Sequence, residues 1–192
     1  MHKISIALLG SHYHPDTDLD QLYGMIHAAG IDGIDFSLES STFNAKNGYV
    51  DSFYKKDMDE LKSIFTRFKE ALDRNGLAVA QTHGPFPTYK FEEGQEAYNA
   101  YLVEATKKCI ELTAFLGGKY IVVHPAHSPN TVLYEEEKAA NMAFYPQFIE
   151  TAKKFDVKIC LENMWGRRGG AGTVFLTAPV PIPAKPANTS TR

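Results

Sequence analysis

The sequence has 192 residues, of which 44% are hydrophobic, and a formal net charge of −3. A chain of this length can bury a core in one domain, or at most two. Its slightly acidic charge argues against a nucleic-acid partner and against a membrane surface bound by electrostatic attraction.

The cysteines and the N-terminal segment bear on the cellular compartment in which the protein is expected to lie. Cys109 and Cys160 lie far apart in apolar segments, and neither belongs to a Cys-x-x-Cys pair, so we expect reduced core thiols in a cytoplasmic protein. The apolar run within residues 1–9 is too short for a signal peptide and is typical of a first strand. No segment approaches the roughly 18 apolar residues of a membrane span, so no membrane partner is expected.

Strands and helices are predicted to alternate along the chain. Short apolar runs, typical of buried strands, alternate with longer segments whose apolar residues recur at helical spacing. The predicted strands begin near residues 3, 32, 77, 119 and 157. The predicted helices cover about residues 19–29, 57–75, 92–116 and 135–155. Pro146 lies inside the last of these helices and is expected to kink it or split it in two.

Local signals mark the ends of the first two helices. Asp16, Thr17 or Asp18 can cap the first helix, and Gly30 is expected to end it in the left-handed conformation. The second helix is expected to begin at Asp57 and to close at residues 75–76.

Strict alternation implies parallel strands joined by right-handed crossovers. A closed TIM barrel needs eight strand–helix units, and only five strands fit in this sequence. We therefore predict an α/β fold with a parallel (β/α) repeat, either as an open five-stranded sheet or as a partial TIM barrel with about five of eight strands.

The composition changes near the C-terminal end. All 23 acidic residues lie at or before Glu162, and Gly and Pro crowd the last part of the chain. We predict a partial barrel domain at residues 1–168 and a Gly/Pro-rich tail at residues 169–192 that is disordered or foreign. A natural flexible tail is the alternative. Such a tail cannot form three more strand–helix units.

Three predicted strands end in a residue suited to chemistry. The third ends at His83, the fourth at His124, and the fifth runs directly into Glu162. Because the carboxyl ends of parallel strands meet at one edge, these side chains are expected to lie together where active sites form in such folds. The alternative is that each polar residue only marks the end of a strand.

The segments around these residues resemble the xylose isomerase-like TIM barrels. The matching motifs are His83-Gly-Pro-Phe, His124-Pro-Ala-His and Leu161-Glu-Asn-Met, in this order after alternating helices. The resemblance covers about residues 3–168. That superfamily contains sugar phosphate isomerases and epimerases and, more distantly, endonuclease IV.

The resemblance implies that Glu162 binds a divalent metal ion and serves as an acid or base. Such an ion, Mn, Zn or Mg, polarises the substrate's carbonyl group so that the adjacent C–H becomes acidic. His83 and His124 match positions that bind substrate in some members and metal in others. The family's remaining metal ligands come from strands six to eight, which are not predicted here.

Other residues could line the same edge. His12 and Asp35 are expected to contact substrate, and Trp165 could form an apolar wall against a sugar ring. Further candidates, for which ordinary surface or packing roles are also expected, are His14, Glu39, Phe86, His127, Arg167 and Arg168.

Three functions remain open. The first is a sugar phosphate isomerase or epimerase that acts on a sugar or sugar phosphate by metal-assisted proton transfer. The second is an endonuclease IV-like zinc phosphodiesterase, against which the acidic charge of the chain counts. The third is a truncated, non-catalytic half-barrel that forms homo-oligomers through its exposed sheet edges.

Overall fold

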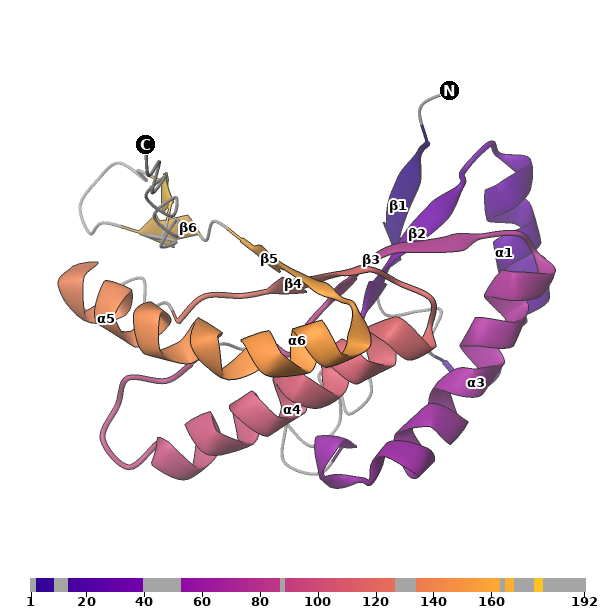
Figure 1. Ribbon diagram of the computed structural model, residues 1–192. Coiled ribbons are helices and arrows are strands. Elements are labelled where there is room, and N and C mark those ends of the chain that lie inside the picture. Colours follow the sequence, from indigo (N-terminus) through magenta and orange to yellow (C-terminus); the bar gives the residue numbers. More distant parts are fainter. Residues whose placement is uncertain are drawn as a thin grey trace, which may run out of the picture.

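Five parallel strands form one sheet in chain order in the computed structural model, as the sequence predicted (Figure 1). The strands are β1 (Ser5–Leu8), β2 (Gly33–Ser37), β3 (Ala78–His83), β4 (Tyr120–Val123) and β5 (Lys158–Leu161). The structure describes residues 3–8, 14–39, 53–86, 89–126, 134–162, 165–167 and 175–177. For the last two ranges it describes the backbone alone.

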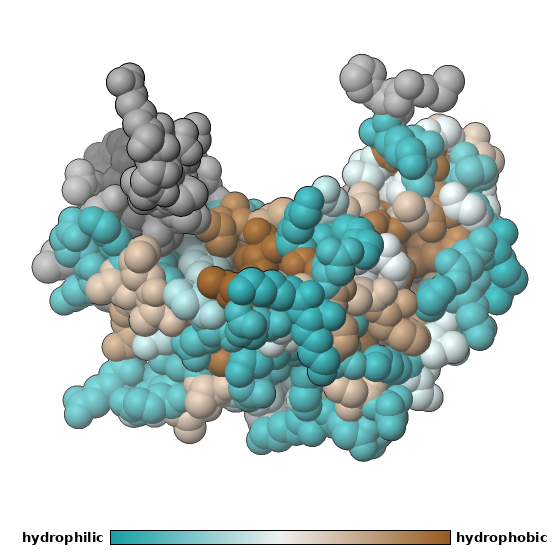
Figure 2. Space-filling model, in the orientation of Figure 1, coloured by the Kyte–Doolittle hydropathy of each residue, from teal (hydrophilic) through white to brown (hydrophobic). Residues whose placement is uncertain are grey.

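The helices cover one side of the curved sheet and leave its concave side open (Figure 1). They are α1 (Leu19–Ala28), α3 (Met58–Arg74), α4 (Glu96–Phe115), α5 (Tyr134–Phe144) and α6 (Ile149–Phe155), with single 3₁₀ turns η2 (Phe53–Lys55) and η3 (Tyr145–Phe148). Figure 2 shows the surface hollowed over the middle of the sheet, where hydrophobic residues gather. Among the described residues, no helix is both long and apolar enough to span a membrane.

The predicted helix ends are confirmed. Of the three candidates, Asp18 caps α1 by accepting a hydrogen bond from the Gln21 backbone N–H at 3.0 Å. Gly30 follows α1 with φ of +83°, a conformation that favours glycine. Asp57 and Glu60 form a reciprocal capping box at the start of α3, with bonds of 2.8 and 3.0 Å.

Pro146 divides the last helical segment, as expected. It lies in η3 between α5 and α6, because proline lacks the N–H that a continuous helix requires. The preceding helix differs from its prediction. It begins at Glu96 rather than near residue 92, since Gly94 has φ of +81° and makes a turn there.

Strand β5 is less buried than the sequence indicated. Leu161 is 37% exposed, and Ile159 and Cys160 are only partly buried. In the described part of the chain β5 pairs with β4 alone, so one side of the strand lacks a neighbour. Cys109 is fully buried, and both cysteines are free thiols as expected.

A short antiparallel pair follows the sheet. Strand β6 (Trp165–Arg167) pairs with β7 (Phe175–Thr177), so the backbone pairs across the predicted domain boundary at residue 168. The other residues of the tail lie outside the described part of the chain, and the tail's foreign origin stays a hypothesis.

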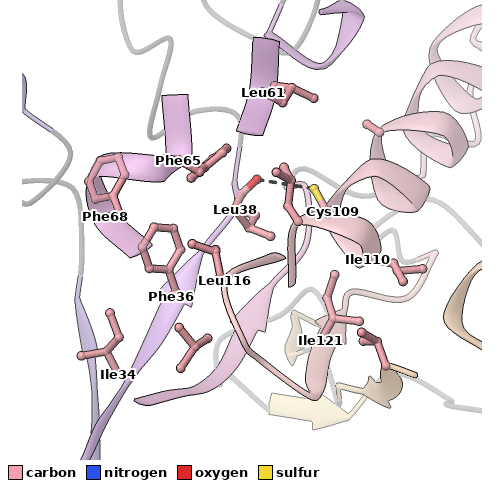
Figure 3. Close-up of a cluster of buried hydrophobic side chains, with 14 of the residues drawn as sticks. Ile34, Phe36, Leu38, Leu61, Phe65, Phe68, Cys109, Ile110, Leu116 and Ile121 are labelled. Carbon is pink, nitrogen blue, oxygen red and sulfur yellow. Dashed lines mark hydrogen bonds between the residues drawn. The ribbon is translucent and has the colours of Figure 1, made fainter. Parts of the chain in front are cut away.

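The core lies between the convex face of the sheet and the helices (Figure 3). Phe36 of β2 is fully buried and packs edge-on against Phe65 and Phe68 of α3, with ring centroids 6.0 and 5.6 Å apart. Leu61 of α3 is also fully buried in this cluster. Beyond β2, Cys109 of α4 extends the cluster. These contacts attach α3 and α4 to β2.

Truncation of Leu61 tests this core. Leu61→Ala is expected to lower the free energy of unfolding by about 2–5 kcal/mol, because it leaves a cavity in a fully buried site. Urea denaturation monitored by circular dichroism measures the change. Met25→Ala in α1 is the control: this side chain is 66% exposed, and its loss should change the value by no more than about 0.5 kcal/mol. Equal effects of the two substitutions would contradict the position of the core.

Candidate functional site

Four polar side chains meet at the carboxyl ends of neighbouring strands, an edge that we call the rim. Strands β2 to β5 run in the same direction, so their carboxyl ends face one side of the molecule. The residues that meet there, one from each strand or from the position just after it, are Asp35, His83, His124 and Glu162. The structure therefore brings together the three residues that the strand ends predicted.

A close approach between β3 and β4 places the two histidines side by side. Gly84 follows His83 directly, and its N–H donates to the Val122 carbonyl at 2.8 Å. A Cβ at Gly84 would lie 3.2 Å from that same oxygen, so glycine permits the tight exit of β3. The rings of His83 and His124 lie 5.8 Å apart between centroids and are tilted by 37°.

His83 is held by Asp35. The two residues lie on adjacent strands, and His83 Nδ1 is 2.8 Å from Asp35 Oδ1. The other carboxylate oxygen of Asp35 accepts a hydrogen bond from Gln81 Nε2, also at 2.8 Å. Asp35 was expected to contact substrate, but both of its oxygens are engaged by neighbouring side chains.

His124 and Glu162 form a less satisfied pair. His124 Nδ1 lies 2.8 Å from Glu162 Oε2, close enough for an ion pair when the ring is protonated. Both ring nitrogens of His124 and Glu162 Oε2 are buried, and no other described residue hydrogen-bonds to them. The Glu162 side chain as a whole is 39% exposed, so this carboxylate can still reach a ligand.

The pKa values of the two histidines are shifted in opposite directions for physical reasons. The hydrogen bond to Asp35 raises the pKa of His83 above its ordinary value of 6.5, against the opposing effect of burial. Burial lowers the pKa of His124, and this effect outweighs the attraction of Glu162. At neutral pH the His124 ring is therefore uncharged.

Glu39 belongs to the same electrostatic cluster. Burial raises the pKa of this carboxyl group, His83 lowers it, and the negative charges of Glu162 and Asp35 raise it further. The segment that carries Glu39 is fixed at Leu38, whose N–H donates to the His83 carbonyl at 2.7 Å. The Leu38 carbonyl accepts from the buried Tyr54 hydroxyl.

Two supporting residues were not predicted from the sequence. Asn141 of α5 is fully buried and holds the loop after His124, with hydrogen bonds of 2.8 Å to both the N–H and the carbonyl of Ala126. The Tyr145 hydroxyl donates to the Val123 carbonyl at 3.0 Å, one residue before His124. An asparagine on the buried face of a helix was the available signal, since a buried amide needs partners.

Phe86 contacts the site, whereas His14 lies on the surface. Phe86 is 39% exposed, and its ring lies edge-on to His124 at 5.1 Å between centroids. The His14 side chain is 67% exposed beside Asp16. Trp165 and Arg167 are described by their backbone only. The candidates outside the described residues are His12, His127 and Arg168.

A complete metal site is not assembled in the described part of the chain. No three residues of the types His, Cys, Asp or Glu are placed there to hold one ion. The predicted ligand set of His83, His124 and Glu162 therefore stays a prediction. His83 differs from the other two because Asp35 already engages one of its ring nitrogens.

A family profile matches most of the sequence. The profile of the xylose isomerase-like TIM barrel family matches residues 24–174. No curated protein matches the sequence at a significant level.

Several solved structures share the fold. A D-tagatose 3-epimerase-like protein has a TM-score of 0.60 and 19% identity, over 88% of this chain and 55% of its own. 3-Keto-D-glucoside 4-epimerase (YcjR) from E. coli has a TM-score of 0.59 and 18% identity, over 85% of this chain and 57% of its own. The IOLI protein, solved with a bound zinc atom, has a TM-score of 0.53 and 16% identity, over 83% of this chain and 51% of its own. The chain thus spans little more than half the length of each of these proteins.

The pKa values of the two rim histidines are expected to lie on opposite sides of the ordinary histidine value. We expect a pKa above 6.5 for His83, which Asp35 stabilises in its charged form, and below 6.5 for His124, which is buried. NMR titration of the ring signals measures both values, with His83→Gln and His124→Gln to assign them. A higher pKa for His124 than for His83 would contradict the arrangement.

The same shifts have opposite effects on stability. Folding raises the pKa of His83, so its stabilising contribution is full below the unfolded value of about 6.5 and is lost as pH rises through the folded value. Folding lowers the pKa of His124, so its contribution is present above the unfolded value and is lost as pH falls toward the folded one.

Proposed function

This chain belongs to the xylose isomerase-like TIM barrel family, and from that premise we propose that it acts on a sugar or sugar phosphate as an isomerase or epimerase. The reaction is the transfer of a proton at a carbon next to a carbonyl group. The observation that carries the proposal is the partly exposed Glu162 carboxylate at the rim, whose Oε2 lies 2.8 Å from His124 Nδ1.

Glu162 is the base in this proposal. A carboxylate at this position can accept a proton from a substrate, and the adjacent His124 ring has a lowered pKa. The carboxylate removes the proton from the carbon next to the carbonyl, and the C–H electron pair forms an enediolate. Its 39% side-chain exposure permits contact with a substrate in the concave side of the sheet.

His83 is suited to stabilise the charge that develops on the substrate. Asp35 raises the pKa of this histidine, so Nε2 carries a proton over a wider pH range than in a free imidazole. A hydrogen bond from Nε2 to the enediolate oxygen would strengthen as negative charge moves there.

The fate of the proton separates the two reaction types. An isomerase returns it from Glu162 to the neighbouring carbon, while the hydroxyl proton of the enediolate moves from one oxygen to the other. An epimerase adds a proton to the opposite face of the same carbon, which needs a second acid. Glu39 is our candidate, because burial and the nearby carboxylates raise the pKa of this group and favour its protonated form.

A divalent metal ion is the cofactor that the family implies. The buried ring nitrogens of His124 and Glu162 Oε2, which no other described residue engages, are suitable donors, and the IOLI relative was solved with zinc. Two donors fall short of the three protein ligands of a typical catalytic site, so the described residues form only part of one. A bound ion would polarise the substrate carbonyl.

A proton-exchange assay tests the proposal. The protein is incubated in D₂O with a panel of ketoses, aldoses and their phosphates, and NMR detects epimer, isomer and deuterium at the reacting carbon. Glu162→Gln should lower kcat by about 10²–10⁴-fold, the usual contribution of a general base. Glu150→Gln is the matched control, since Glu150 is 85% exposed on α6 and pairs with Lys153.

Two outcomes would contradict this function. One is undiminished turnover in Glu162→Gln. The other is nicking of abasic DNA by a protein inactive on every sugar, which would favour the endonuclease IV-like alternative.

Metal content is a separate measurement. Plasma mass spectrometry of the purified protein should find Mn or Zn at less than one ion per chain, because carboxylate and imidazole donors bind such ions but the described residues supply only part of a site. His124→Ala and Glu162→Ala should each lose the ion, whereas Glu150→Ala should keep it. An unchanged metal content in the first two variants would exclude these residues as ligands.

A further inference from the structure

We propose that Gln81 and Asp35 form a clamp that fixes the tautomer and orientation of His83, so that Nδ1 holds its proton and Nε2 faces the rim. The clamp consists of two contacts on one carboxylate: Asp35 Oδ1 with His83 Nδ1, and Asp35 Oδ2 with Gln81 Nε2, each at 2.8 Å. The catalytic consequence of the clamp rests on the proposed function, but the tautomer does not.

A register shift in the sheet creates the clamp. Ile34 pairs with Val79, whereas the next residue of β2, Asp35, pairs with Gln81, so β3 advances by two residues while β2 advances by one. Without this bulge Asp35 would lie beside Ala80, which has no polar group to offer. Bulges re-aim side chains in this way and recur near active sites.

The alternation of β3 then brings both partners to the same carboxylate. Gln81 and His83 are two residues apart, so their side chains lie on the same face of the strand. Asp35 lies between them in space, with only 15% of its side chain exposed. Its two oxygens are used by two different donors, which prevents the carboxylate from rotating.

Hydrogen-bond chemistry decides the tautomer. An ionised carboxylate only accepts hydrogen bonds, so the proton between the two groups is on His83 Nδ1. Nδ1 therefore carries a hydrogen in both the neutral and the charged ring, and Nε2 is the nitrogen left to meet a ligand. This is the opposite of the tautomer that dominates in free histidine. Asp35 and Gln81 are thus positioning residues that act through His83.

Nitrogen NMR tests the clamp directly. Two-bond ¹H–¹⁵N spectra of ¹⁵N-histidine-labelled protein, recorded at a pH where His83 is neutral, distinguish the tautomers. We expect Nδ1–H in the wild type, Nε2–H in Asp35→Leu, and an averaged signal of both forms in Gln81→Met. Asp35→Asn should keep Nδ1–H, because its amide oxygen can still accept and Gln81 can turn its own oxygen toward the new NH₂ group.

Controls separate the clamp from general effects on the fold. Gln147→Met removes an exposed glutamine whose Nε2 bonds only the Ala143 carbonyl at 3.1 Å, and it should leave the tautomer of His83 unchanged. An Nε2–H tautomer in the wild type would overturn the clamp. A wild-type spectrum in Gln81→Met would overturn the part assigned to Gln81. Circular dichroism shows whether each variant is folded. If Asp35→Leu does not fold, the wild-type tautomer and the change expected in Gln81→Met decide the question.

Measurements of catalytic activity give a second test of the clamp. Asp35→Leu and Gln81→Met should lower kcat by about 10- to 100-fold, the range seen when partners of functional histidines are removed, with little change in KM. Asp35→Asn should recover most of the lost rate. If the tautomers follow the expectation and no variant or wild type turns over any sugar, the proposed function fails and the clamp stands.

Discussion

The rim depends on the parallel register of β2 to β5. Along β2, Phe36 points into the core, where it is fully buried, while Asp35 points to the concave side and meets His83. A slip of one residue would exchange the two faces, which would bury the carboxylate and expose the phenyl ring. The aromatic packing of Phe36 against α3 therefore fixes the geometry of the polar site on the other face of the same strand.

Strand ends made part of this site predictable. His83, His124 and Glu162 each follow a short apolar run, and parallel strands bring such positions to one edge. The role of Asp35 was not predictable, because it depends on a register shift that leaves no mark in the hydrophobic pattern. Asn141 was missed for a similar reason: its partners belong to a loop fifteen residues earlier, which periodicity along one helix does not reveal.

Two histidines on adjacent strands acquire different properties from their partners. The well-aligned contact with Asp35 favours the charged form of His83. Glu162 is equally close to His124 at 2.8 Å, yet burial is the largest effect on the pKa of His124 and lowers it. One rim thus presents a histidine with a raised pKa next to a histidine with a lowered pKa and a carboxylate. Proton transfer to and from carbon needs groups whose pKa values are set apart in this way.

The contrast between the pairs also indicates where a ligand would bind. Asp35 and His83 satisfy each other, with Gln81 on the remaining oxygen. His124 and Glu162 contact each other at 2.8 Å, and no other described residue hydrogen-bonds to the two ring nitrogens or to Glu162 Oε2. The Glu162 side chain is also 39% exposed. In our proposal the second pair is therefore the one that meets a ligand, and the first pair supports it.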